Sequence, residues 1–133
     1  MNKDSVLWAD DDADDLRIFN EAADEINNEL EIITVNNGRE LLDFLRDAVA
    51  QDDLPSMIIM DMNMPLVSGR EVLAEIKRDE RLREIPVAVF TTSNSSIDLM
   101  YCSKFHVMMF TKPWTFPRVK DVVREILQLR RAH

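Results

Sequence analysis

Short apolar runs alternate along the chain with longer segments in which apolar residues recur at a helical spacing. Four of the runs are continuously apolar, which is typical of parallel strands buried on both faces. The run 31–35 has polar neighbours, so we expect it at an edge of the sheet. The five runs are Val6–Ala9, Glu31–Val35, Met57–Met60, Val87–Phe90 and Val107–Phe110.

Four of the segments between and after these runs place apolar residues on one stripe of a helix. The segment from Ser95 to Phe105 is the weakest helix, because only Ile97, Met100 and Tyr101 suggest a face. Strands that alternate with helices predict right-handed crossovers, a mainly parallel sheet and a three-layer α/β sandwich. The four stripes are Leu16, Phe19, Ala23 and Ile26; Leu41, Leu45 and Ala48; Val72, Leu73 and Ile76; and Val119, Val122, Val123, Ile126 and Leu127.

Length and composition predict one domain over residues 1–133, with no output domain. The chain has 133 residues, 46% of them hydrophobic, which suffices for one core. Its net charge of −9 would repel a phosphate backbone, so we expect no nucleic-acid partner. No apolar run approaches the ~18 residues of a membrane span. The lone Cys102 excludes an internal disulfide and suits a reducing compartment, so we expect a soluble, cytoplasmic protein without a membrane partner.

Charged and hydroxyl side chains follow four of the apolar runs directly. Asp10 and Asp11 follow the first run, Asp61 the third, Thr91 the fourth, and Lys112 follows the fifth. In an open parallel sheet the carboxyl ends of the strands form the ligand-binding edge. We therefore expect these five side chains to form one site.

The composition of this site favours a magnesium-dependent phosphoacceptor. If the first and third strands are neighbours, Asp10 or Asp11 lies close to Asp61, and such carboxylates repel unless a cation intervenes. Magnesium prefers oxygen ligands, whereas a zinc site would need the cysteine cluster or paired histidines that the sequence lacks. Lys112 and Thr91 suit phosphoryl oxygens, and the carboxylate of Asp61 can form an acyl phosphate.

Four sequence blocks contain these residues, namely 6–12, 60–65 followed by Gly69, 85–91 and 111–113. In this order, and across nearly the whole chain, they resemble the signature blocks of CheY-like response-regulator receiver domains. The resemblance implies a flavodoxin-like, doubly wound (βα)5 sandwich with strand order 2-1-3-4-5. It also implies that Asp61 is the phosphoacceptor and that Thr91 and Lys112 contact the phosphoryl group. Mg²⁺, or Mn²⁺ in its place, would be bound by Asp11, by Asp61 and by the backbone carbonyl of Asn63. Asp10 would contact the metal ion mainly through water.

The resemblance further implies a regulatory protein rather than an enzyme. The phosphoryl donor would be a phosphohistidine on a sensor histidine kinase or a histidine phosphotransfer protein. The chain would then act by binding a downstream protein or by passing the phosphoryl group on, and the sequence does not choose between these. A homodimer through the face of the fourth helix, fifth strand and fifth helix would also fit the family.

Two other functions are weighed against this reading. Asp61-Met62-Asn63 faintly resembles the nucleophile motif of haloacid-dehalogenase-type phosphatases, but here it follows the third strand and Asn63 stands where a carboxylate is usual. A pseudo-receiver that binds partners without phosphorylation would not need the complete set of site residues.

Two positions depart from the family pattern. Met109 occupies the position of a usual aromatic residue, which puts an aromatic-gated switch in doubt. The turn at 103–106 lacks glycine, so either a non-glycine residue takes positive φ or the turn is built differently.

Neighbours of the site have simpler interpretations. Asp12, Asp14 and Asp15 favour a helix N-terminus through the helix dipole. Trp114 follows Lys112-Pro113 and either is exposed, if this loop lies at the rim of the site, or packs over the last helix.

Overall fold

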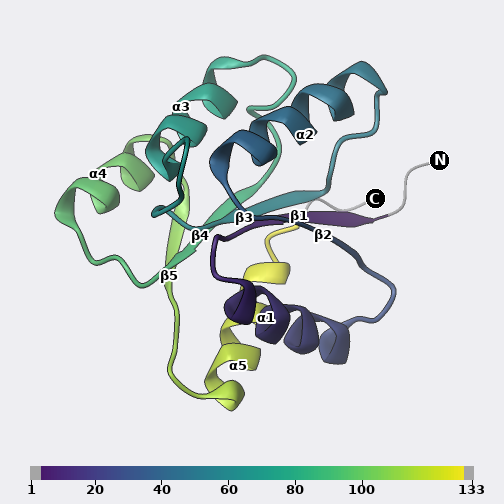
Figure 1. Cartoon of the computed structure of the whole chain (residues 1–133), viewed down its shortest axis with the longest axis vertical. Coiled ribbons are helices and arrows are strands. Elements are labelled where there is room, and N and C mark those ends of the chain that lie inside the picture. The colour runs from purple at the N-terminus through teal and green to yellow at the C-terminus, as the bar shows by residue number, and fades with distance from the viewer. Residues whose placement is uncertain (1–3, 131–133) are drawn as a thin grey trace.

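The computed structural model describes residues 4–130, which form a parallel five-stranded sheet between two layers of helices. In Figure 1, α1 and α5 cover one face of the sheet, and α2, α3 and α4 lie on the other side. The predicted three-layer α/β sandwich is confirmed. In chain order the elements are β1 (Ser5–Ala9), α1 (Ala13–Ile26), β2 (Glu31–Val35), α2 (Gly38–Ala50), β3 (Met57–Met60), α3 (Gly69–Arg78), β4 (Val87–Thr91), α4 (Ser96–Lys104), β5 (Met108–Thr111) and α5 (Phe116–Leu127).

The strand order is β2-β1-β3-β4-β5, as the family resemblance implied. Ala9 at the end of β1 pairs with Met60 at the end of β3, and Met60 pairs with Val89 of β4. Thr91 pairs with Thr111, so β4 and β5 end together. This register brings the residues that follow β1, β3, β4 and β5 to one edge of the sheet.

Each face of the sheet has its own hydrophobic core, because successive side chains of a strand point to opposite faces. Leu7 of β1 packs on the side of α2 and α3, among residues that include Leu41 and Leu73. Trp8 faces α1, where its ring stacks on Phe19 with 5.4 Å between centroids. The helical stripes predicted in α1, α2, α3 and α5 supply most of the buried residues of these helices.

The last strand differs from the prediction of a strand buried on both faces. β5 begins at Met108 and ends at Thr111, one residue later than the apolar run, and the side chain of Met108 is 52% exposed. It has β4 as its neighbour on one side and lies at the edge of the sheet. β2 lies at the other edge, as predicted from its polar neighbours.

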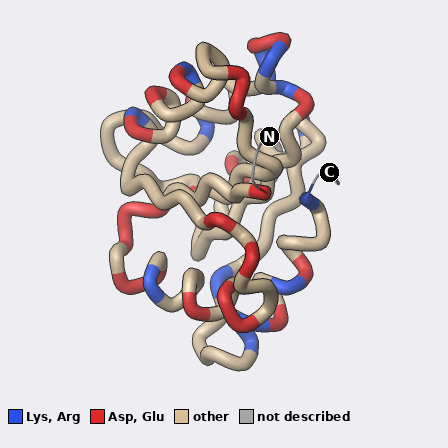
Figure 2. Tube along the Cα trace, turned by 90° about the vertical axis from the view of Figure 1, so that its right-hand side faces the viewer, with Lys and Arg blue, Asp and Glu red and all other residues tan. Residues whose placement is uncertain are grey.

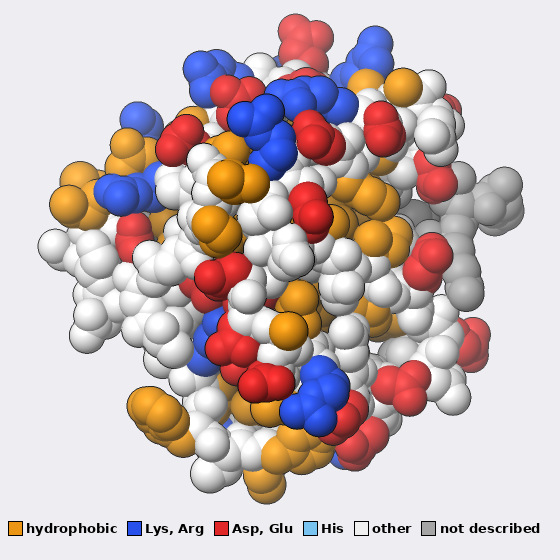
Figure 3. Space-filling model, in the orientation of Figure 1, with side chains coloured by type: hydrophobic (Ala, Val, Ile, Leu, Met, Phe, Trp, Pro, Cys, Tyr) orange, Lys and Arg blue, Asp and Glu red, His pale blue; other side chains and the backbone are white. Residues whose placement is uncertain are grey.

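The face suggested for α4 is confirmed only at Tyr101, which is half-buried and packs against the core. Ile97 and Met100 are exposed, whereas Asp98 is buried. Its carboxylate accepts a hydrogen bond of 2.6 Å from the Ser93 hydroxyl and lies 3.6 Å from the Arg70 guanidinium. These two partners compensate the buried charge. Other side chains of α4, among them Ile97, Leu99 and Met100, are exposed. In Figure 3 hydrophobic side chains lie at the side of the molecule where Figure 1 places α4.

The sequence left two alternatives for the turn between α4 and β5: a non-glycine residue at positive φ, or a different kind of turn. The structure has the first. His106 has φ of 58°, in the left-handed region that favours glycine. The next amide, of Val107, donates to the Cys102 carbonyl at 2.8 Å and closes the end of the helix. The turn is therefore of the ordinary helix-terminating kind, with histidine in place of glycine.

Charged residues are distributed along most of the described chain. Figure 2 shows Lys and Arg positions interspersed with Asp and Glu along the trace, with acidic positions more frequent. Within residues 4–130, every helix is too short or too polar to cross a lipid bilayer.

Candidate functional site

Asp10 and Asp61 are held side by side because the hydrogen-bond ladder of the sheet continues past the strand ends. The amide of Asp61 donates to the carbonyl of Ala9 at 3.1 Å, and the amide of Asp10 donates to that of Val35 at 3.1 Å. Both side chains are buried, with Asp10 only 1% exposed. The sheet thus places two carboxylates in an environment that penalises unpaired charge.

Three carboxylates at this edge form a group that can hold a metal ion. One oxygen each of Asp10, Asp11 and Asp61 lies within 4.8 Å of the others. The donor atoms are all oxygens, which suits a hard divalent cation, and Asp11 is exposed to solvent, which leaves room for bound water. Asn63 lies on the same loop, and its amide donates to Asp61 Oδ1 at 3.1 Å. Its backbone carbonyl as a fourth ligand stays a prediction.

Lys112 and Thr91 both contact Asp61. The Lys112 ammonium lies 2.8 Å from Asp61 Oδ2, 2.6 Å from Asp10 Oδ2 and 3.0 Å from Asp15 Oδ2. The Thr91 hydroxyl donates to Asp61 Oδ1 at 2.6 Å. The amide of Lys112 also donates to the Thr91 carbonyl at 2.9 Å, so the ends of β4 and β5 are fixed to each other. The structure therefore brings together all the side chains that the sequence assigned to the site.

Burial is the largest influence on the pKa of Asp10. Loss of solvent raises the pKa of Asp10 to about 6, although the hydrogen bond with Lys112 acts in the opposite direction. For Lys112, burial alone would lower the pKa, but the hydrogen bonds with Asp10 and Asp61 raise it above its ordinary value. Lys112 is therefore charged at neutral pH and offsets part of the negative charge of the carboxylates.

We expect Asp10→Asn to stabilise the protein at neutral pH when divalent metal is removed with a chelator. The pKa of Asp10 is about 6 in the folded protein, compared with an ordinary value of 3.8 for an aspartate. The native state therefore binds one more proton than the unfolded chain between these two pH values. Ionisation of Asp10 then lowers the unfolding free energy as pH rises through this window, by about 2–3 kcal/mol at its upper end. Urea unfolding of both proteins from about pH 4 to pH 7.5 measures this difference.

Over this range the two proteins should differ least near pH 4, where Asp10 is protonated in the folded chain and about half protonated in the unfolded chain. Asp11→Asn is the matched control, because Asp11 is exposed. If wild type and Asp10→Asn show the same pH dependence, burial does not raise the pKa of Asp10.

Two glycines hold the loop between β3 and α3 against its neighbours. A Cβ atom at Gly69 would lie 2.6 Å from Met62 Cα, and one at Gly38 would lie 2.0 Å from the Val67 carbonyl oxygen. Both contacts are with backbone, which cannot move aside as a side chain can. The loop that carries Asp61 and Asn63 is thus packed directly against the first residues of α2 and α3.

The sequence interpretation missed the contact of Asp15 with Lys112. Asp12 caps α1 by accepting hydrogen bonds from the amides of Asp14 and Asp15, as a helix N-terminal residue should. Asp14 is exposed and pairs with Arg17, whereas Asp15 reaches Lys112. Nothing in the local pattern separates these acidic neighbours, because the contact joins residues 97 positions apart.

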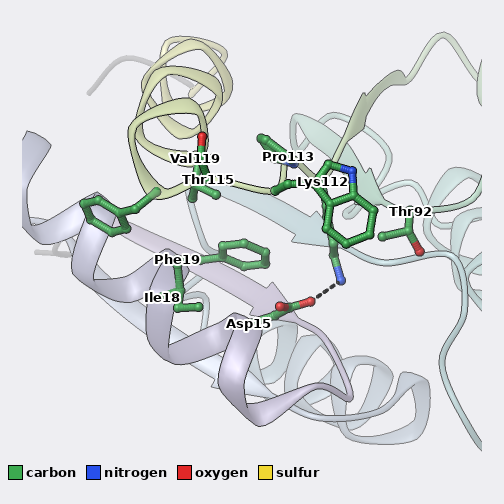
Figure 4. Close-up of a pocket in the computed structure, with 10 residues that line it drawn as sticks. Asp15, Ile18, Phe19, Thr92, Lys112, Pro113, Thr115 and Val119 are labelled. Carbon is green, nitrogen blue, oxygen red and sulfur yellow. Dashed lines mark hydrogen bonds and ion pairs between the residues drawn. The ribbon is translucent and has the colours of Figure 1, made fainter.

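An open cavity lies on the α5 side of Lys112. Its volume is about 410 Å³, and its walls include Phe19 of α1 and Val119 of α5. Trp114 also lines this cavity and is 99% exposed, so of the two alternatives that the sequence left open the structure has the exposed one. In Figure 4 the Lys112 side chain points from the end of β5 toward Asp15 of α1 at one side of this cavity.

Comparison with known proteins finds similarity over most of the chain. The family model described as the response regulator receiver domain matches residues 6–124. The probable methanogenesis regulatory protein FilR2 of Methanothrix harundinacea is 44% identical over 94 residues, which are 69% of this chain and 61% of FilR2. Response regulator Rcp1 of Synechocystis sp. is 34% identical over 104 residues, which are 77% of this chain and 71% of Rcp1.

Two solved structures have the same architecture. The crystal structure of the phosphorylated cyanobacterial phytochrome response regulator RcpA matches with a TM-score of 0.86 and 33% identity, covering 96% of this chain and 93% of RcpA. The Mn²⁺-bound form of Rcp1 matches with a TM-score of 0.82 and 31% identity, covering 92% of this chain and 91% of that one.

Proposed function

The chain belongs to the response regulator receiver domain family, and we propose that Asp61 is the residue on which it accepts the phosphoryl group. Receiver domains act in two-component signalling, where histidine kinases phosphorylate them and they contact downstream targets. The observation that supports this role of Asp61 is that several side chains of the site contact its carboxylate or lie next to it. It accepts a hydrogen bond from Thr91 at 2.6 Å, lies 2.8 Å from Lys112, and shares the acidic group with Asp10 and Asp11.

We propose Mg²⁺ as the cation of this site. Receiver domains bind a divalent metal at the acidic pocket, and the Rcp1 structure similar to this chain is described as Mn²⁺-bound. Asp10, Asp11, Asp61 and the backbone carbonyl of Asn63 would hold the ion, since oxygen ligands suit Mg²⁺ and Mn²⁺ alike. Bound there, the cation supplies positive charge that favours phosphoryl oxygens close to carboxylates.

Different residues of the site would then perform different steps of phosphoryl transfer. A carboxylate oxygen of Asp61 attacks the phosphorus of a phosphohistidine, the P–N bond breaks, and an acyl phosphate forms while the imidazole leaves. The Lys112 ammonium and the Thr91 hydroxyl, which contact Asp61 in the resting protein, donate hydrogen bonds to the phosphoryl oxygens. Burial of Asp61 and Thr91 limits the access of water to the product.

The phosphoryl donor in this proposal is a sensor histidine kinase or a histidine phosphotransfer protein. Output through contact with a target and onward phosphotransfer both remain compatible with the site. For a protein target or a second copy of the chain, we propose the face of α4, β5 and α5. It carries the exposed apolar side chains of Ile97, Met100 and Met108.

We also propose that the chain is regulatory and does not turn over phosphomonoesters. In the haloacid-dehalogenase-type motif a second carboxylate stands two residues after the nucleophile, whereas this chain has Asn63 there. Asn63 offers no acid or base for the leaving group.

Incubation with acetyl phosphate and Mg²⁺ is expected to add one phosphoryl group to the protein. Acetyl phosphate supplies the phosphoryl group directly, so the test needs no cognate kinase. Intact-mass spectrometry measures the adduct, and omission of Mg²⁺ with added chelator should remove it because the carboxylates would then repel the donor.

A chain that gains no mass with Mg²⁺ or Mn²⁺ would be a pseudo-receiver, which binds partners without phosphorylation. Assorted phosphomonoesters serve as the second arm. Multiple turnovers of these compounds would contradict the proposal that the chain is regulatory.

A further inference from the structure

Lys112 has a carboxylate partner that lies outside the metal-binding group. Its ammonium pairs with Asp10 and Asp61, which belong to that group, and donates a hydrogen bond to Asp15, which does not. Figure 4 shows Asp15 reaching from α1 toward Lys112, with Phe19 on the same helix. The ammonium therefore lies within 3.0 Å of three carboxylates.

We propose that Asp15 is a positioning residue for Lys112, the counterion that retains the ammonium when a divalent cation takes the oxygens of Asp10 and Asp61. This inference rests on the metal site proposed above. It assigns a function to an acidic side chain that neither binds the cation nor contacts the phosphoryl group.

Charge repulsion makes such a counterion necessary. Lys112 and a cation at the acidic group would compete for oxygens of the same two carboxylates. Two positive charges that contact the same carboxylates repel each other, and a divalent ion repels an ammonium more strongly than a monovalent ion does. A carboxylate on the other side of the ammonium lowers this repulsion without occupying the cation site.

The surroundings of Asp15 hold its carboxylate beside the Lys112 ammonium. Its backbone is fixed because its amide donates to the Asp12 side chain at 3.1 Å in the cap of α1. Its side chain is 32% exposed, so it can follow a displacement of the ammonium. The ring of Phe19, with its centroid 5.7 Å from the Lys112 nitrogen, bounds the position from another side and favours a cation over its face.

Asp14 provides a matched control on the same helical turn. It carries the same charge one residue away, but it is exposed and pairs with Arg17 rather than with Lys112. Asp14→Asn therefore changes the net charge of the first turn of α1 exactly as Asp15→Asn does, without removing a partner of Lys112.

Calorimetric titration with Mg²⁺ tests the proposal in the full chain. We expect Asp15→Asn to weaken Mg²⁺ binding about tenfold, the range seen when a partner beyond the metal ligands is lost. Asp14→Asn should change it by less than about twofold, as a solvent-exposed charge does. In a Lys112→Met background, Asp15→Asn and Asp14→Asn should have equal effects, because the ammonium that Asp15 retains is gone.

Lysine-ammonium NMR gives a second measurement that does not depend on activity. In the Mg²⁺-loaded wild type and Asp14→Asn proteins, the Lys112 ammonium signal should persist, because its bond to Asp15 slows proton exchange with water. In Asp15→Asn the signal should broaden on addition of Mg²⁺.

Each contrary result has a distinct meaning. Equal Mg²⁺ affinities of Asp15→Asn and Asp14→Asn in the wild-type background would overturn the role of Asp15 and leave the metal site intact. An excess effect of Asp15→Asn that survives Lys112→Met would mean that Asp15 acts on the cation directly, which also overturns it. A wild-type chain that binds no Mg²⁺ would overturn the metal site itself.

Discussion

Asp61→Asn is expected to abolish the phosphoryl adduct while leaving the fold intact. An amide is not a nucleophile toward phosphorus at neutral pH, so the substitution removes the acceptor itself. Asparagine has the same shape as aspartate, and its carbonyl oxygen can still accept from the Thr91 hydroxyl and the Asn63 amide. Lys112 keeps Asp10 and Asp15 as carboxylate partners. The measurement is intact mass after incubation with acetyl phosphate and Mg²⁺.

Asp53→Asn is the control for this substitution, since Asp53 is exposed and lies in the loop before β3, whereas Asp61 follows the other end of that strand. It should gain the same adduct as wild type. An acyl phosphate is cleaved by hydroxylamine, whereas a phosphate ester on Thr91 or Ser93 is not. An adduct that survives in Asp61→Asn, or one that resists hydroxylamine in wild type, would place the phosphoryl group elsewhere.

Gly38→Ala is expected to lower the unfolding free energy by about 3 kcal/mol, the upper part of the range for overpacked sites. The added methyl group would lie 2.0 Å from the carbonyl oxygen of Val67, so α2 and the loop between β3 and α3 must separate. Neither glycine of the chain has positive φ, so the effect comes from space and not from backbone conformation. Urea unfolding measures it.

Ser96→Ala is the matched control, because Ser96 is the first residue of α4 as Gly38 is of α2, and it is exposed. It should change the unfolding free energy by less than about 0.5 kcal/mol. A Gly38→Ala protein as stable as wild type would show that the loop can move away from α2 at little cost. The same loop carries Asn63, so weaker Mg²⁺ binding should accompany the loss of stability.

The burial of β5 and that of α4 both differ from what the sequence predicted, because burial depends on which elements lie beside a segment. The run Val107–Phe110 is apolar enough for a strand buried on both faces, but β5 lies at the edge of the sheet and exposes Met108. On α4, Ile97 and Met100 are exposed while Asp98 is buried. A carboxylate can be buried here only because Ser93 and Arg70, on other elements, reach it. Local hydrophobicity does not contain that information.

Sequence by itself determined the fold class and the members of the site. Hydrophobic periodicity distinguishes strands from helices, and parallel strands bring their carboxyl ends to one edge, so Asp10, Asp61, Thr91 and Lys112 had to meet there. Tertiary structure alone decided which acidic neighbour of the site contacts Lys112. Asp14 and Asp15 are alike in sequence, and the rotation of α1 against the end of β5 aims only Asp15 at the ammonium. Such contacts depend on distances between elements, which the spacing of residues along a chain does not encode.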